Sequence, residues 1–121
     1  MRIIFPTDEN NGYLSKRGAH FGKAKFYTVI TLENDKIVDV ETQENPGHAN
    51  GRCANAITNI MSLKPNALIV SGIGSAPAQG FANAGLAVYK DHISTTIEES
   101  IARFIKDGLQ RIGNKGTCLA N

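Results

Sequence analysis

The chain has 121 residues, 41% of them hydrophobic, which is enough for one compact domain with a single core. Its formal charge of +2 comes from 13 Lys and Arg against 11 Asp and Glu, too small a surplus to indicate binding to nucleic acid or a membrane surface. No apolar run approaches the ~20 residues of a membrane span and the N-terminus leads directly into a strand, so we expect a soluble, cytoplasmic protein.

The first half of the sequence predicts three strands. Residues 2–5 form a short apolar strand that the following proline ends. Residues 6–23 are polar and have no helical or strand period, and loops of this length in compact domains are usually functional or mobile. Apolar residues alternate over 26–32 and, less cleanly, over 37–42, and the Asn-Asp pair between them suits a tight turn, so these residues predict an antiparallel hairpin.

The second half of the sequence predicts three helices that alternate with two strands, because helical spacing of apolar residues alternates with short β-branched runs. The expected elements are a helix over 52–63, a buried strand over 67–70, a helix over 77–84, a strand over 86–89 and a helix ending at Gly108. Residues 95–98, Thr-Thr-Ile-Glu, match a capping box for the last helix. Residues 1–108 therefore form a single domain, and residues 109–121 are expected to be a flexible tail.

This order of elements predicts an α/β fold with a mixed five-stranded sheet and about three helices. Right-handed crossovers make the first, fourth and fifth strands parallel, whereas the hairpin makes the second strand antiparallel. If the second strand pairs with the first, the carboxyl ends of the parallel strands and the long polar loop lie at one edge. Ligands bind at this edge in open α/β sheets. All three histidines and one of the two cysteines fall there.

The side chains at this edge suit a metal site. Imidazole and thiolate groups favour soft or borderline metals and metal-sulfur clusters, so the candidate metal ligands are His20, His48, Cys53 and His92. The start of a helix favours the thiolate form of Cys53. Each of these residues could also have no role in metal binding, because a loop histidine is often only solvated and a cysteine is often a small buried apolar residue.

An anionic ligand would also find partners at this edge. The turn containing Gly72 and Gly74 joins the buried strand to a helix N-terminus, where backbone N–H groups and the helix dipole favour an anion. Arg17 and Arg52 lie in the loops that reach the same edge. The glycines could equally serve only to make a tight turn, and the basic residues could form a solvated face.

Several segments of the sequence resemble segments of a known protein family, and they follow one another in the order found in that family. They are residues 1–7, His20-Phe21-Gly22-Lys23-Ala24, Glu44-Asn45-Pro46, Gly72-Ile73-Gly74, residues 84–89 and residues 96–101. Together they resemble the dinitrogenase iron-molybdenum cofactor biosynthesis domain, the NifX-like family, over nearly the whole chain up to Gly108.

The resemblance implies a ribonuclease-H-like fold and a function in cofactor assembly. It implies that the protein binds or carries an iron-sulfur or iron-molybdenum type cluster without catalysis, and that its partners are cluster donor and acceptor proteins. The histidine of the His-Phe-Gly segment is the expected cluster contact, which maps onto His20 and places Phe21 and Gly22 beside the cluster.

Two functions other than cluster binding find less support in the sequence. An enzyme acting on a phosphorylated or carboxylated small molecule at the glycine turn would need Asp8, His48 or His92 as its acid or base, but no nucleophile and base stand at a recognisable spacing. A two-metal nuclease needs acids that project from core strands, and the first strand, residues 2–5, contains none.

Overall fold

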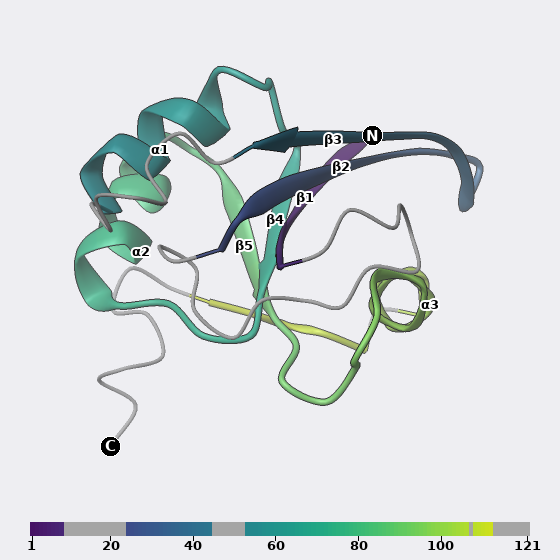
Figure 1. Ribbon diagram of the computed structural model, residues 1–121. Coiled ribbons are helices and arrows are strands. Elements are labelled where there is room, and N and C mark those ends of the chain that lie inside the picture. The colour runs from purple at the N-terminus through teal and green to yellow at the C-terminus, as the bar shows by residue number, and fades with distance from the viewer. Residues whose placement is uncertain (9–23, 45–52, 107, 113–121) are drawn as a thin grey trace.

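The computed structural model describes residues 1–8, 24–44, 53–106 and 108–112, which form a mixed α/β fold (Figure 1). The side chains of residues 53–56, 75 and 76 lie outside this description. In chain order the elements are β1 (Arg2–Thr7), β2 (Phe26–Glu33), β3 (Lys36–Glu44), α1 (Cys53–Met61), β4 (Ala67–Val70), α2 (Ser75–Asn83), β5 (Ala87–Lys90), α3 (Ile97–Ile105) and β6 (Gln110–Arg111).

The strands form one sheet in the order β3-β2-β1-β4-β5-β6. β1 pairs in parallel with β4, and β4 in parallel with β5, whereas β2 runs antiparallel to both β1 and β3. The predicted parallel direction of β1, β4 and β5 and the antiparallel second strand are therefore confirmed, and β2 pairs with β1 as the predicted common edge requires. The predicted number of five strands is wrong, because β6 pairs antiparallel with β5 inside the segment 109–121 that the sequence predicts as a tail.

Apolar residues on either side of β6 explain why this short segment joins the sheet. Leu109 packs against the core on one face of the sheet and Ile112 against the core on the other. The Ile112 N–H also donates to the Val88 carbonyl at 2.7 Å. Two apolar residues flanking a two-residue strand are too few to produce a period in the sequence, so the prediction missed them.

The central strands alternate their side chains between two apolar layers. Ile4 and Leu68 share one layer with Phe81 of α2, and Ile3 shares the other with Ile101 of α3. Figure 1 shows α1 and α2 together on one side of the sheet and α3 on the other. β4 is buried along its whole length, as predicted for a strand covered on both faces.

A two-residue turn at Asn34 and Asp35 joins β2 to β3. Both residues have positive φ, 53° and 64°, as a type I′ hairpin turn requires, so the predicted hairpin is confirmed. A register shift beside Thr31 makes Val38 the extra residue of a β-bulge, where it is 52% exposed. This bulge explains the imperfect alternation over residues 37–42.

Helix α3 begins one residue later than the capping box in the sequence indicates. The Thr96 hydroxyl accepts a hydrogen bond from the Glu99 N–H at 3.4 Å and donates to the Glu99 carboxylate at 3.3 Å. The predicted box at residues 95–98 is therefore wrong. A start at Ile97 turns that side chain and Ile101 towards the sheet, where both are buried.

β1 continues through Pro6, although the sequence predicts that this proline ends the strand. On the β4 side, only Ile3 and Ile4 of β1 are paired, so Pro6 has a paired strand on its β2 side alone. A residue without an N–H group is tolerated where a strand is paired on one side only.

The close contact between α1 and α2 depends on Gly80. A Cβ atom built there would collide with the Cδ1 atom of Ile57. Alanine could be accommodated if the end of the Ile57 side chain rotates, but valine adds two further methyl groups. We expect Gly80→Val to lower the free energy of unfolding by ~1–3 kcal/mol, measured by urea denaturation. Gln79→Val on the exposed face of α2 is the control, and an equal loss in both variants would contradict the packing argument.

Candidate functional site

One edge of the sheet gathers the ends of five strands. Thr7, the last residue of β1, is paired with Phe26 at the start of β2, which is paired with Glu44 at the end of β3. The parallel strands β4 and β5 end at the same edge, where Val70 is paired with Lys90. We call the edge formed by these five residues the carboxyl rim. The predicted common edge is confirmed, and α1, α2 and α3 each begin after a strand that ends on it.

Most of the predicted ligand residues lie in the two segments that leave the rim. Residues 9–23 and 45–52 lie outside the described residues. They contain Arg17, His20, Phe21 and Gly22 in the first segment, and His48 and Arg52 in the second. Cys53 is the first residue of α1, and its side chain also lies outside the description. The structure therefore places the points where both segments leave the sheet, the start of β2 where the first ends and the start of α1 where the second ends, but not the side chains themselves.

The turn from Gly72 to Gly74 connects β4 to α2 at the rim. Gly74 is the N-cap of α2, and its carbonyl accepts the Ala78 N–H at 3.1 Å. Gly74 has φ −71°, and an added Cβ would meet Pro77 only at an ordinary contact distance of 3.7 Å. Neither the backbone nor these neighbours require glycine here. Since glycine offers no capping side chain, it leaves the first N–H groups of α2 without a side-chain cap.

A buried aspartate fixes the segment that follows β5. Asp91 is 3% exposed and accepts three hydrogen bonds, from the N–H groups of Ile93 and Ser94 at 3.0 Å each and from the Ser100 hydroxyl at 2.7 Å. Its own N–H donates to the Val70 carbonyl at 2.9 Å. These bonds tie the end of β5 to β4, to its own loop and to α3.

The same bonds determine the charge state of Asp91. Burial alone would raise the pKa of this carboxyl group, but hydrogen bonds from Ser94, Ser100 and Ile93 outweigh it. The pKa of Asp91 therefore lies well below its ordinary value of 3.8, and the group remains a carboxylate at neutral pH.

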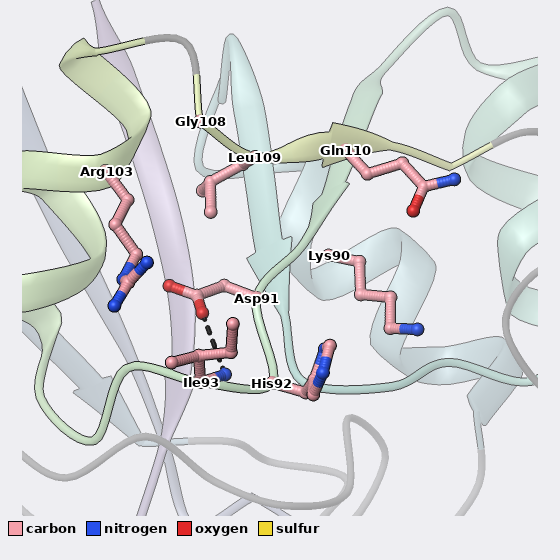
Figure 2. Close-up of a pocket in the computed structure, with 8 residues that line it drawn as sticks. All are labelled: Lys90, Asp91, His92, Ile93, Arg103, Gly108, Leu109 and Gln110. Atoms are coloured by element: carbon pink, nitrogen blue, oxygen red, sulfur yellow. Dashed lines mark hydrogen bonds between the residues drawn. The ribbon is translucent and has the colours of Figure 1, made fainter.

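His92 follows this anchor and is exposed at the rim. A cavity of about 190 Å³ opens beside it, lined by residues from β5, the β5–α3 loop, α3 and the β6 region (Figure 2). Apart from Cys53, whose backbone begins α1, the predicted site residues whose positions are described are His92, Gly72 and Gly74, and all three follow parallel strands that end at the rim. The structure thus brings these three to one edge, as the sequence predicts.

The described residues do not by themselves complete a metal site. Within residues 1–8, 24–44, 53–106 and 108–112, no group of three His, Cys, Asp or Glu side chains could hold a metal ion. Of the four predicted metal ligands, only His92 has a described side chain. None of the described helices is both long and apolar enough to cross a membrane.

Sequence reasoning missed the anchoring role of Asp91. An aspartate directly after a strand, with a serine three residues later, is a recognisable signal for a side chain that accepts backbone N–H groups in a turn. The bond to Ser100 had no such signal, because it depends on how α3 packs against the sheet.

Known proteins are similar to this chain over most of its length. An uncharacterised protein of Methanocaldococcus jannaschii is 29% identical over 113 residues, which are 92% of this chain and 91% of that protein. The apo form of the orange protein from Desulfovibrio gigas is similar in structure, with a TM-score of 0.81, 18% identity and 92% of each chain covered. A candidate NifB protein from Thermotoga has a TM-score of 0.74 and 23% identity, with 91% of each chain covered.

The solved structures are only 18% and 23% identical to this chain, so their similarity shows the fold alone. The family follows from a match between this sequence and a family model. The family model described as dinitrogenase iron-molybdenum cofactor matches residues 1–107. This range includes all five strands that meet the carboxyl rim and the three helices that follow them. The chain therefore belongs to the dinitrogenase iron-molybdenum cofactor family.

Proposed function

We propose that the protein binds an anionic iron-sulfur or iron-molybdenum type cluster at the carboxyl rim and carries it from a donor protein to an acceptor protein. The cluster is cargo, so the protein acts as a cytoplasmic carrier and not as an enzyme, on a ribonuclease-H-like fold. The observation that carries this proposal is the common edge: both long polar segments leave the sheet at the rim, beside His92 and the Gly72–Gly74 turn. The first segment returns to the sheet there as β2, and the second leads into α1. Family membership supports the class of cargo.

The proposed site divides into two sets of residues. His20, His48, Cys53 and His92 supply the imidazole and thiolate ligands that metal-sulfur clusters prefer. The remaining residues surround the cargo and offset its negative charge through N–H groups and guanidinium groups. They are Arg17, Phe21, Gly22, Arg52, Gly72 and Gly74.

The helix termini alone would hold such an anion only weakly. A helix N-terminus stabilises a nearby negative charge by ~0.3–1 kcal/mol. Even three of them fall far short of the ~10–16 kcal/mol typical of thiolate and imidazole ligation of a structural metal. Bonds to His20 and the other ligands must therefore supply most of the affinity, and the uncapped start of α2 supplies charge complementarity.

The proposal is tested by anaerobic reconstitution of the full chain with iron, sulfide and molybdate. We expect charge-transfer absorption in the visible range and bound metal after gel filtration. His20→Ala should lose most of both signals, because it removes the principal ligand. Lys36→Ala, in the hairpin at the opposite end of β2 and β3, is the control and should load like the wild type. An unloaded wild-type protein, or full loading of His20→Ala, would refute the proposed ligand set.

A further inference from the structure

The cavity at the end of β5 presents two hydrogen-bond donors that the cluster proposal does not use, Lys90 and Gln110, beside His92, which it does use. It is lined by Lys90 from β5, His92 from the following loop and Gln110 from β6, among others. Figure 2 shows these three side chains extending to the same side of β5, whereas Asp91 and Arg103 lie on the other side. The strand β6 that brings Gln110 here lies in the segment that the sequence predicts as a tail.

These donors have no partner among the described residues. Within that part of the chain, neither the Lys90 ammonium, the His92 ring nor the Gln110 amide takes part in a hydrogen bond or ion pair. Asp91 is the sole acid in the described lining, and its two oxygens already accept three hydrogen bonds. The free groups on the Lys90 side are therefore positive or neutral donors.

We propose that this side of the cavity binds a tetrahedral oxyanion, either a free inorganic phosphate or the phosphate group of a small ester. An ammonium group has three donors and no acceptor, and an imidazole and an amide can each add a donor, so together they match the oxygens of a phosphate. A cavity of about 190 Å³ is smaller than the ~300–1,000 Å³ of sites for drug-sized ligands. The cavity therefore has room for a small anion or for the phosphate group of a short ester.

The test is a nuclear magnetic resonance titration of the metal-free full chain with inorganic phosphate at constant ionic strength. We expect saturable shifts of the amide signals of Lys90, His92 and Gln110. Lys90→Gln should weaken phosphate binding about tenfold, since it removes a charge-assisted hydrogen bond. Lys106→Gln removes the same charge from the exposed C-cap residue of α3, outside the cavity lining, and should leave the affinity unchanged.

A second variant and a second ligand distinguish a specific phosphate site from a basic surface, and a phosphate ester from free phosphate. Gln110→Ala should weaken phosphate binding without removing a charge, which separates a built site from general attraction to a basic surface. Glycerol 3-phosphate is the second ligand: tighter binding than phosphate assigns the site to an ester, and equal or weaker binding assigns it to the free anion. Linear, unsaturated shifts, or equal affinities in the Lys90→Gln and Lys106→Gln variants, would overturn the proposal.

This outcome is separable from that of the cluster proposal. Phosphate binding is measured without metal, and neither Lys90 nor Gln110 belongs to the proposed cluster ligands. His92 is shared by both, so it is left unchanged in the variants. Loss of phosphate binding in Lys90→Gln with normal cluster loading would support two distinct ligands at the rim.

Discussion

Asp91→Ala is expected to lower the free energy of unfolding by about 3 kcal/mol. The substitution removes the acceptor for two backbone N–H groups and for the buried Ser100 hydroxyl, and each buried donor left unpaired costs ~1–3 kcal/mol. Urea denaturation at neutral pH measures this loss. Asp39→Ala, on the exposed part of β3, should change stability by less than ~0.5 kcal/mol. A loss below ~1 kcal/mol in Asp91→Ala would contradict the anchoring role.

The contribution of Asp91 should also depend on pH. Its pKa is lower in the folded protein than the ordinary value of 3.8, so the unfolded chain takes up a proton first as the pH falls. The stabilisation is therefore fully present above 3.8 and is lost as the pH falls from there towards the folded pKa. The stability difference between wild type and Asp91→Ala should be constant near neutral pH and shrink in strong acid. A difference that grows on acidification would contradict this sign.

Phe81→Ala is expected to lower the free energy of unfolding by ~3–5 kcal/mol. Phe81 has no exposed surface and lies in the core between α2 and the sheet, so alanine leaves a cavity there. Thermal and urea unfolding measure the loss. Asn83→Ala, on the exposed face of the same helix, is the control and should differ little from wild type. Similar losses in the two variants would mean that α2 is not held by this contact.

These two side chains hold the rim from opposite faces of the sheet. Asp91 ties the loop that carries His92 to α3, and Phe81 holds α2, whose start follows the Gly72–Gly74 turn. A cluster or anion bound at the rim would therefore meet segments fixed by the core, as precise ligand placement requires. Weakened ligand binding in either variant has to be compared with its loss of stability before a direct role is assigned.

The order of the elements could be predicted from the sequence, because alternation, helical spacing and turn residues act locally. The Asn34-Asp35 hairpin and the buried β4 are examples. The features that were missed depend on packing between distant segments. The bulge at Val38, the continuation of β1 through Pro6 and the strand β6 are each fixed by a neighbouring strand or by the two core layers.

The candidate site divides in the same way. The gathering of Gly72, Gly74 and His92 at one edge follows from the parallel direction of β4 and β5, which the sequence predicts. The buried carboxylate of Asp91 and the contribution of Gln110 to a cavity could not be predicted, because they require the positions of α3 and β6. The roles of His20, His48 and Cys53 stay predictions, since their side chains lie outside the described residues.

The carboxyl rim as the place of cluster binding is tested most directly by paramagnetic broadening of amide signals. A paramagnetic iron-containing cluster, reconstituted anaerobically into the full chain, broadens the signals of nearby residues. We predict broadening at Asp8, Glu44, the Gly72–Gly74 turn and His92, with sharp signals at the hairpin residues 33–36. Broadening centred on that hairpin, or spread evenly over the sheet, would contradict a site at the rim.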